Sequence, residues 1–560
     1  MWRIGSIRSK EENRGDENRS LPPHNSLTAE DRQSMITFVR TFLQSDRLKE
    51  ESGGQAEGTD LPDVGRSVTL SVAFWIDGAL RGCRIVHQKP LREALRQAAF
   101  QAIRDSRFKP VGEEELNEAR IEIVVLIPSE KMPVYRLRER KEIDPEKAYR
   151  VSYENRQGWL LPEVFNCLRF RGMDDFLRTL ITEKAGLRID RRCLIRAEIE
   201  TFSVDDFIES EEKKQVFSLF GPLVTDGLRY DSFDGRCLGD LEAMSHRAAS
   251  QLLRIQEEDG NIPPIIDPLS GKMKQVDWVR LALAAVALES FGKATETEEY
   301  RIAARKAGEY VWRYGYDHPY LDTYTRTLCR VYYAEYLLVS GREEEAKSIA
   351  WELSNQVHLL RFEPIFFLKA ASLLLSFEEK EFLGTAEKLF GSVWDDFSKK
   401  RDRGEYIELA RFPELIVVAE KLFMMTRESR YREKSIRVTE WFIAQQHVRG
   451  SFPSATGSGF SYTRGTGKIF EVLALHPHEY RESLLRVFGW LRSMQYSGEN
   501  AFFVRPEHRK KVLGGFRHDV FNQEVWIDAS SHVLLGSSRI LQAMKQKNPD
   551  KGDFVVEKFI

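Results

Sequence analysis

The sequence has no apolar run of about 18 residues, the length that a membrane-spanning helix needs, so we expect no membrane span. It also has no excess charge of one sign, since 84 Lys and Arg residues stand against 86 Asp and Glu residues. A chain balanced in this way is not expected to bind nucleic acid. Residues 1–25 are rich in charge and lack the apolar core of a signal peptide, so we expect a disordered lead there.

Cysteine is scarce, with five residues and no Cys-x-x-Cys pair. Structural zinc sites usually draw on such pairs, and the His-Glu-x-x-His motif of zinc proteases is missing from the sequence as well, so we expect no metal. The odd number of cysteines and the missing signal peptide indicate free thiols in a reducing compartment, and hence a cytoplasmic protein. Nothing in the sequence names a cofactor.

The length of 560 residues and the hydrophobic content of 42% predict more than one domain. The first, 26–211, mixes strands and helices without a regular strand–helix–strand repeat, which is typical of an α+β domain. Its clearest elements are a β-rich run, a hairpin turn, an amphipathic helix and an apolar strand, at 68–76, Asp77-Gly78, 92–104 and 121–127. Residues 212–239 are expected to link it to a second part.

Several short motifs in this first part, taken in order, resemble the AMMECR family. They are Asp77-Gly78, Leu80-Arg81-Gly82-Cys83, Pro90-Leu91, Arg104-Asp105-Ser106-Arg107-Phe108, Glu114-Glu115-Leu116, the strand 121–126, Gly158-Trp159-Leu160-Leu161-Pro162-Glu163-Val164 and Lys184-Ala185-Gly186-Leu187. Two positions depart from the usual pattern: Arg84-Ile85 stand where the family has Ile-Gly, and Ser106 stands where it has proline. The resemblance implies partners of the Memo and radical-SAM types.

The run from Leu80 to Cys83 is the motif that the resemblance marks as functional. Gly82 allows close approach of a ligand or of backbone, so Arg81 and Gly82 are candidate substrate contacts. Cys83 lies between two arginines, whose positive charge is expected to lower the pKa of its thiol and to favour the reactive thiolate. Cys83 is therefore a candidate catalytic residue. The alternative is a buried structural cysteine, with Arg81 in a salt bridge.

The second part, 240–547, has a helical pattern almost throughout. We expect about twelve helices, charge-rich ones alternating with apolar ones at intervals of about 40–55 residues. The charge-rich helices should begin near Asp240, Glu296, Glu343, Glu379, Glu428 and Glu479. The apolar helices should begin near Gln275, Leu321, Phe362, Arg411, Arg464 and Glu524. Six such hairpins predict an all-α (α/α)6 toroid with the apolar helices inside, and an open solenoid is the alternative. Residues 548–560 should form a tail.

A short repeat supports the toroid. Gln256 stands four positions before Gly260 and Gln446 four before Gly450, while Gln495 to Gly498 is a shortened version. We expect each glycine to cap an outer helix. The pattern is similar to repeats of the terpenoid cyclases, and the toroid as a whole resembles those of the terpenoid cyclase and prenyltransferase superfamily or of the six-hairpin glycosidases. The motifs specific to cyclase or prenyltransferase chemistry are missing from the sequence, so neither reaction is expected.

Acidic residues recur where the inner helices are expected to begin, at Asp277, Asp322, Glu363, Glu414 and Asp528. An acid in the first turn also stabilises a helix dipole by about 0.3–1 kcal/mol, which is the simpler explanation for each one singly. Aromatic residues accumulate beside them, at Trp278, Tyr320, Tyr324, Phe362, Phe412, Phe460, Tyr462 and Trp526. Rings and carboxylates together suit a small-molecule, glycan or peptide ligand in the toroid.

The densest polar cluster runs from Arg517 and His518 to His532. Asp528 and His532 lie four positions apart, so their side chains can meet on one helical face, and an acid that orients a histidine is a common general base. Both are candidate catalytic residues, although an inert hydrogen bond is the alternative. The candidate substrate contacts in the toroid are Asp277, Asp322, Glu363, Tyr462, Arg517, His518 and Trp526.

Three functions fit these patterns. The first is an enzyme or enzyme subunit whose Cys-bearing cleft and toroid cup act on one substrate. The second is a binding or scaffold protein whose toroid holds a peptide, glycan or lipid, and the third is a toroid glycosidase or lyase with an accessory AMMECR-type domain. A cup with convergent, accessible acids favours an enzyme, and a centre filled by side chains favours a scaffold.

Overall fold

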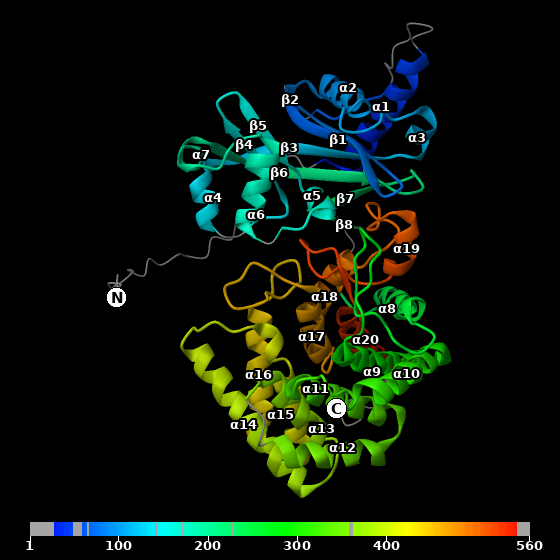
Figure 1. Cartoon of the computed structure of the whole chain (residues 1–560), viewed down its shortest axis with the longest axis vertical. Coiled ribbons are helices and arrows are strands. Elements are labelled where there is room, and N and C mark those ends of the chain that lie inside the picture. Colours follow the sequence, from blue (N-terminus) through cyan, green and yellow to red (C-terminus); the bar gives the residue numbers. More distant parts are fainter. Residues whose placement is uncertain are drawn as a thin grey trace, which may run out of the picture.

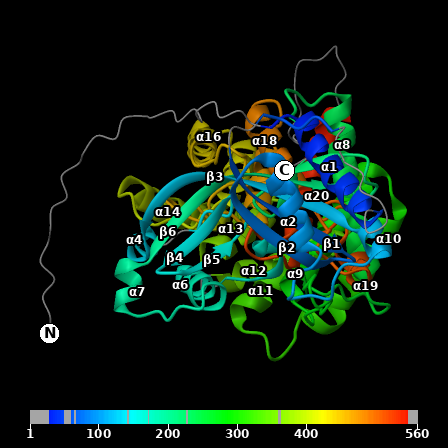
Figure 2. The same cartoon turned by 90° about the horizontal axis from the view of Figure 1, so that it is seen from above.

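The computed structural model describes residues 27–48, 59–63, 67–140, 143–170, 172–225, 229–357 and 362–545. A part built on one sheet packs against a larger helical part (Figure 1). Viewed from above, the sheet lies over the helices (Figure 2). The expected lead, 1–25, and tail, 548–560, fall outside the described residues. Among those described, no helix is both long and apolar enough to span a membrane.

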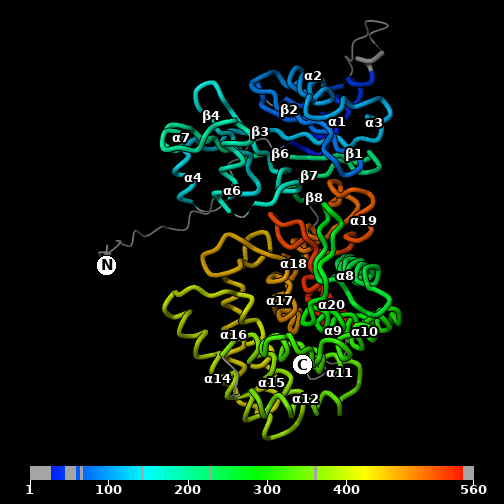
Figure 3. The backbone as a smooth tube through the Cα atoms, in the orientation of Figure 1, coloured from blue at the N-terminus to red at the C-terminus, as the bar shows by residue number. Residues whose placement is uncertain are grey.

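The N-terminal part contains one antiparallel sheet in the order β2-β1-β3-β6-β4-β5, with β7 and β8 continuing from β6. Its strands are β1 (Val68–Ile76), β2 (Ala79–Lys89), β3 (Arg120–Pro133), β4 (Lys147–Tyr153), β5 (Arg156–Leu160), β6 (Glu198–Glu209), β7 (Val216–Phe220) and β8 (Leu223–Thr225). The expected linker, 212–239, therefore contributes two strands to the sheet. It also includes the start of the first toroid helix, α8 (Gly235–Ile255), which is the next described helix after β8 (Figure 3).

The two faces of the sheet have different neighbours because successive residues of a strand point to opposite sides. Leu70, Val72 and Phe74 of β1 pack with residues of α1 (Ala29–Leu48) and α2 (Leu91–Ala102). Trp75 instead joins the core of the helical part. The remaining helical segments of this part are α3 (Glu113–Glu118), α4 (Val134–Arg140), α5 (Val164–Cys167), α6 (Met173–Arg178), the π-helix Thr179–Lys184 and α7 (Arg191–Arg196).

The helical part is a closed toroid of hairpins. Its outer helices, among the residues described, are α8 (Gly235–Ile255), α10 (Glu298–Tyr310), α12 (Glu343–Gln356), α14 (Lys380–Asp402), α16 (Ser429–Ala444) and α18 (Arg481–Met494). Its inner helices are α9 (Trp278–Thr295), α11 (Thr323–Ser340), α13 (Pro364–Leu374), α15 (Glu414–Thr426), α17 (Thr463–Leu473) and α20 (Ile527–Lys545). The last inner helix, α20, packs against both α9 and α17, which closes the ring and excludes an open solenoid. The predicted fold class is confirmed.

The glutamine–glycine repeat ties neighbouring outer helices together. The side-chain amide of Gln256 donates to the Gly260 carbonyl at 3.2 Å and to a carbonyl of α10 at 3.0 Å. Gln446 does the same with Gly450 and a carbonyl of α18. A Cβ on Gly260, whose φ is +103°, would lie 2.3 Å from the Lys306 carbonyl oxygen. Only glycine fits there, because both the left-handed backbone and the contact exclude a side chain.

The third copy of the repeat corrects one prediction. The amide of Gln495 donates to the Gly514 carbonyl at 2.8 Å and to a carbonyl of α8 at 2.8 Å. Gly514 has a φ of +91°, and its Cβ would lie 2.1 Å from the Arg247 carbonyl oxygen. The partner of Gln495 is thus Gly514 and not Gly498, because an insertion that includes α19 (Pro506–Val512) separates them.

This insertion, 496–513, is also where the toroid meets the sheet. The ring of Trp75 packs edge-on against Phe502, with centroids 5.0 Å apart. Gly78, in the turn between β1 and β2, approaches the insertion so closely that a Cβ would lie 2.3 Å from the carbonyl carbon of Val504. The predicted Asp77-Gly78 turn therefore serves two purposes, since it closes the hairpin and it docks against the toroid.

Candidate functional site

Cys83 lies in β2 with its side chain on the same face of the sheet as Trp75 and the toroid. Its Sγ is 3.3 Å from the Ser71 hydroxyl oxygen. The residue keeps partial solvent exposure, yet dense packing around the sulfur, followed by the charge of Glu163, raises the pKa of the thiol to about 12. The prediction of a lowered pKa is wrong, and Cys83 is a protonated thiol at neutral pH.

The arginines near Cys83 do not activate it because each has an acidic partner. Arg84 and Arg107 both pair with Asp105, at 3.2 and 2.6 Å. Arg81 pairs with Glu115 at 2.6 Å, which is the salt bridge that the sequence left as the alternative. The positive charges around Cys83 are therefore engaged in ion pairs with acidic residues of the same domain. A catalytic role for Cys83 stays a prediction.

The glycine of the motif has a packing role. A Cβ on Gly82 would lie 2.0 Å from the carbonyl oxygen of Ala102, at the end of α2. Gly82 thus allows the backbone of β2 to approach the backbone of α2 closely. Arg81 borders a small cavity of about 430 Å³, which Arg505 and Pro506 of the toroid insertion also line.

Asp528 and His532, the predicted catalytic pair, have other partners. The Nδ1 of His532 lies 2.7 Å from Oε2 of Glu471 on α17, while Asp528 accepts a hydrogen bond from Arg280 at 3.0 Å. Both side chains are buried, with 3% and 1% of their surface exposed. Burial opposes ionisation of Asp528, but the charges of Arg280 and Arg464 outweigh it and lower its pKa. The predicted pairing is wrong, and side chains fill this centre of the toroid.

Two of the recurring acids are helix caps. Asp277 accepts from the backbone amide of Arg280 at 3.1 Å, and Asp322 accepts from that of Thr325 at 3.0 Å. Hydrogen bonds from Thr325 also lower the pKa of Asp322. The simpler explanation for acids at the inner-helix starts, stabilisation of the helix N-terminus, is thus correct for both.

A cavity of about 900 Å³ opens at the mouth of the toroid, beside the starts of α11 and α13. Asp322 and Glu363 line it, as does Arg411, whose guanidinium lies 2.7 Å from Glu408 and 3.5 Å from Glu363. Its aromatic lining is Tyr324, Phe362, Phe366, Tyr406 and Phe412. One arginine thus pairs with two of the carboxylates in this cavity.

Three further predicted contacts form a stack. The ring of Tyr462 is parallel to that of His518, with centroids 5.8 Å apart, and His518 lies 4.2 Å from Trp526. The guanidinium of Arg280 lies over the ring of Trp526, 4.5 Å from its centroid. The sequence therefore identified three side chains that lie together. Their rings pack against one another, Tyr462 with His518 and His518 with Trp526.

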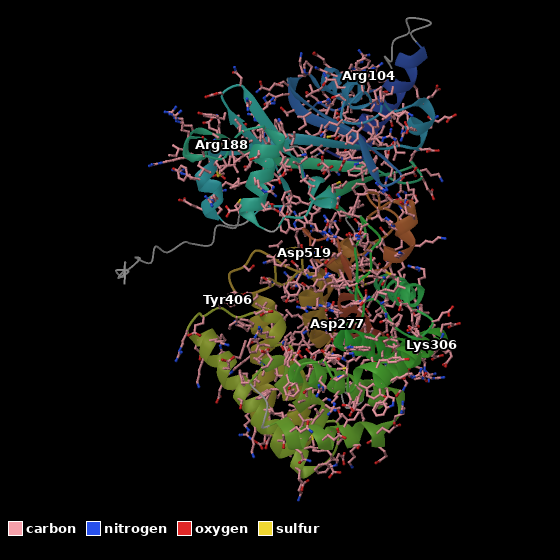
Figure 4. All side chains as sticks on the ribbon, in the orientation of Figure 1. Arg104, Arg188, Asp277, Lys306, Tyr406 and Asp519 are labelled. Carbon is pink, nitrogen blue, oxygen red and sulfur yellow. The ribbon has the colours of Figure 1, made fainter. Side chains whose placement is uncertain are left out.

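A cavity of about 1390 Å³ lies between the sheet and the toroid. Its lining comes from both parts, with Tyr149, Phe170 and Phe220 on one side and Phe460, Trp490 and Phe521 on the other. Phe460 and Phe521 belong to segments that lead into the inner helices α17 and α20, and Trp490 lies on the outer helix α18. Asp519, labelled in Figure 4, lies at this junction, whereas Asp277 and Tyr406 lie on the toroid.

Arg517 holds the junction together instead of contacting a substrate. Its guanidinium donates to Oδ1 of Asn166 at 2.7 Å and to the carbonyl of Phe165 at 3.0 Å. It also donates to the carbonyls of Asp519 and Val520 in its own loop. Only 2% of its surface is exposed, so the predicted substrate contact at this position is wrong.

The comparisons with known proteins match the two parts separately. The AMMECR1 family model matches residues 36–207. A protein of Methanosarcina acetivorans is 35% identical over 185 residues, which cover 32% of this chain and 89% of that protein. A protein of Methanosarcina barkeri is 34% identical over 180 residues, which cover 31% and 85%. The chain belongs to the AMMECR1 family.

Solved structures resemble each part. PH0010 of Pyrococcus horikoshii, an uncharacterized protein, covers 35% of this chain and 98% of its own, with 22% identity and a TM-score of 0.30. An unsaturated glucuronyl hydrolase specific for heparin covers 55% and 98%, with 12% identity and a TM-score of 0.42. The GH76A alpha-1,6-mannanase of Salegentibacter sp. HEL1_6 covers 54% and 99%, with 13% identity and a TM-score of 0.40.

The AMMECR1 domain contains a group of side chains that sequence analysis missed. Glu122 of β3, Glu163 before α5 and Asp206 of β6 each bring a carboxylate oxygen within 4.8 Å of the other two. The sequence signal was the presence of acids inside apolar strands, in Ile121-Glu122-Ile123 and in Val204-Asp205-Asp206-Phe207. Within a strand, however, a lone acid reads equally well as an exposed position.

Proposed function

We propose that this protein is a binding component that holds a polyhydroxylated ligand, of the oligosaccharide class, between its AMMECR1 domain and its toroid. The observation that carries the proposal is the cavity of about 1390 Å³ that both parts line. Ligand sites are most often large, partly apolar clefts, and they occur preferentially where two domains meet. The first function predicted from the sequence also had the two parts share one ligand.

The lining supports this ligand class. Phe460 and Phe521 stack with centroids 6.4 Å apart and offer ring faces to a sugar. The basic residues of the cleft are already neutralised: Arg449 pairs with Glu146, and Arg140 pairs with Glu130 at 2.5 Å. A lining of rings and paired charges favours a ligand that has hydroxyl groups and apolar faces but little net charge.

Binding without hydrolysis fits the state of the candidate catalytic groups. Glycoside hydrolysis needs one carboxylic acid with a raised pKa and one free carboxylate. At the toroid mouth Glu363 and Glu408 share Arg411, and hydrogen bonds lower the pKa of Asp322. The pKa of Cys83 is raised, so no nucleophile is prepared there either.

An oligosaccharide array probed with the full chain tests the proposal, followed by calorimetry on the sugars retained. Phe460→Ala and Phe521→Ala should each weaken binding at least about tenfold, since each removes a ring from the cleft. Tyr320→Ala is the matched control, because its ring is 91% exposed and lies outside the cleft lining. Retention of no sugar, or equal binding by the cleft variants, would overturn the proposal.

A glycosidase or lyase at the toroid mouth is the second candidate. The cavity of about 900 Å³ with Asp322, Glu363 and aromatic residues favours it. Product release from the same oligosaccharides, lost in both Glu363→Gln and Asp322→Asn, would establish this activity. Release that persists in both variants, or no release by the native chain, would count against it.

We further propose partners of the Memo and radical-SAM types, as the resemblance implies, which would supply the chemistry that this chain's own groups are not poised for. The five cysteines are free thiols, which fits a cytoplasmic setting. Co-purification of the tagged full chain with each partner type, compared with an Arg449→Ala variant at the cleft, tests this association.

A further inference from the structure

Three carboxylates of the AMMECR1 domain converge between the sheet and α5. In the sheet register Glu122 stands opposite Ile208 and Val124 stands opposite Asp206, so Glu122 and Asp206 project from the same face. Glu163 reaches them from the residue before α5. The exposed fractions of Glu122, Glu163 and Asp206 are 0, 6 and 2%, so water is largely excluded from all three.

Their oxygen atoms are short of partners. Four buried oxygens have no hydrogen-bond partner among the described residues: Oε1 of Glu122, Oε2 of Glu163 and both Oδ atoms of Asp206. The indole of Trp75 donates to the other oxygen of Glu122 at 2.7 Å. Arg120, on the same strand as Glu122, has its guanidinium paired with Glu499 of the toroid. Buried polar atoms nearly always have a hydrogen-bond partner, so we expect these four oxygens either to bind a ligand or to carry protons.

In the absence of a cation, the pKa of each of the three carboxyl groups is raised above its ordinary value. Burial raises the pKa of Glu122 to about 7, with Trp75 acting against the shift. Burial and then the charge of Glu122 raise the pKa of Glu163 well above its usual range. For Asp206, burial and the charges of Glu122 and Glu163 raise the pKa in the same way. Without a cation these groups share protons, and with one they are ionised.

We propose that Glu122, Glu163 and Asp206 bind one hard divalent cation of the Mg²⁺ and Mn²⁺ class. The donors are all oxygen, which this class prefers over zinc or copper. Oxygens that share an ion at about 2.1–2.4 Å stand about 3–4.8 Å apart, and the three carboxylates meet this limit of 4.8 Å. The expectation of no metal came from the cysteine and histidine pattern and did not consider oxygen donors.

The position of this site gives it a structural consequence. Glu163 immediately precedes α5, and two residues of that helix, Phe165 and Asn166, accept hydrogen bonds from Arg517 of the toroid. A cation that binds Glu163 to the two strands fixes α5 from the side of the sheet, while Arg517 fixes it from the side of the toroid. Occupancy of the site is therefore coupled to the stability of the junction, independently of any ligand in the cleft.

Mn²⁺ binding to the full chain tests the proposal. After treatment with EDTA and desalting, the chain is titrated with MnCl₂ at pH 7.5, with free Mn²⁺ followed by EPR and unfolding followed by calorimetry. We expect one Mn²⁺ per chain and a rise in Tm of about 2 °C at a hundredfold excess over Kd. Failure of the native chain to bind Mn²⁺ at pH 7.5 and 8.5 would mean that the carboxyls share protons, which overturns the proposal.

The variants locate the site. Asp206→Asn and Glu163→Gln should each abolish Mn²⁺ binding and its effect on Tm, while the metal-free Tm stays equal or rises because a buried acid is gone. Glu198→Gln, on the same strand as Asp206 but with a side chain 52% exposed, is the matched control and should bind one Mn²⁺. Stoichiometric binding that persists in both site variants, or its loss in the control, would overturn the assignment.

Discussion

Arg517 and Asn166 are 351 positions apart in the sequence, and the guanidinium of the first donates to the amide oxygen of the second at 2.7 Å. Every hydrogen bond of Arg517 ends on a neutral acceptor, either this amide or a backbone carbonyl. Burial lowers the pKa of Arg517, as expected for a cation without a paired carboxylate. A buried cation that no carboxylate neutralises thus links the AMMECR1 domain to the toroid.

Arg517→Met should destabilise the junction by about 3–5 kcal/mol, because it leaves Oδ1 of Asn166 buried without a donor and removes one of the two donors to the Phe165 carbonyl. Urea unfolding followed by fluorescence should change from one transition to two as the parts uncouple. Arg138→Met is the control: that arginine is exposed, pairs with Asp174, and should cost less than about 1 kcal/mol. An unchanged single transition in Arg517→Met would contradict the role assigned here.

Gly514→Ala should lower the free energy of unfolding by about 2–4 kcal/mol. Its left-handed backbone disfavours alanine, and the new Cβ would meet the Arg247 carbonyl at 2.1 Å. Gly498→Ala should cost less than about 1 kcal/mol, because its Cβ would lie 3.3 Å from the flexible end of Glu211. Chemical denaturation of both variants checks this, and equal losses would refute Gly514 as the partner of Gln495.

Cys83 should resist thiol reagents at neutral pH. With a pKa of about 12, about one thiol in ten thousand is ionised at pH 8, and only the thiolate reacts. Ser71→Ala should slow the reaction further, since the Ser71 hydroxyl lowers the pKa of this thiol. Labelling with a disulfide reagent, located by peptide mass analysis, measures the rate, and all five cysteines of the chain unfolded in guanidinium serve as the reference. Rapid labelling of native Cys83 at pH 7 would contradict this.

Lys421 should make stability depend on alkaline pH. Burial lowers its pKa to about 8 from 10.5, so the unfolded chain holds this proton more tightly than the folded chain. Burial of the charged amine destabilises the folded chain fully below pH 8, and this destabilisation is lost as pH rises from 8 to 10.5. Relative to Lys421→Met, the native chain should therefore gain about 1–3 kcal/mol across that range. Denaturation curves of the native chain and of Lys421→Met at pH 7.5, 9 and 10.5 measure this gain. A constant difference between the two would mean that the pKa of Lys421 is not lowered.

The sequence predicted the toroid well because its signal is local. Each inner and outer helix begins within five residues of the predicted start, as with Glu343, since apolar periodicity and capping residues lie next to one another in the chain. Two copies of the glutamine–glycine repeat were found for the same reason. The third was paired with Gly498 because spacing alone does not reveal an insertion.

The candidate sites were harder to predict because their partners are distant in sequence. The spacing of Asp528 and His532 gave their shared helical face but not Glu471, which lies 61 positions from His532 on another helix. The pKa of Cys83 was misjudged because burial of the sulfur raises it, and because Asp105 and Glu115, 22 and 32 positions away, pair with the arginines on either side of Cys83. Carboxylates from two strands and a loop meet only once the sheet has formed.

The insertion that contacts the sheet is synthesised long after the sheet itself. Phe502, which covers Trp75, is made roughly 280 residues after β8 completes the sheet, a delay of roughly 15 to 60 s at ribosomal speeds of about 5–20 residues per second. Throughout that interval the apolar face of a finished AMMECR1 sheet emerges from the ribosome uncovered. The nascent chain is thus a client for chaperones at one defined face, and slow codons between α8 and α18 would prolong that exposure.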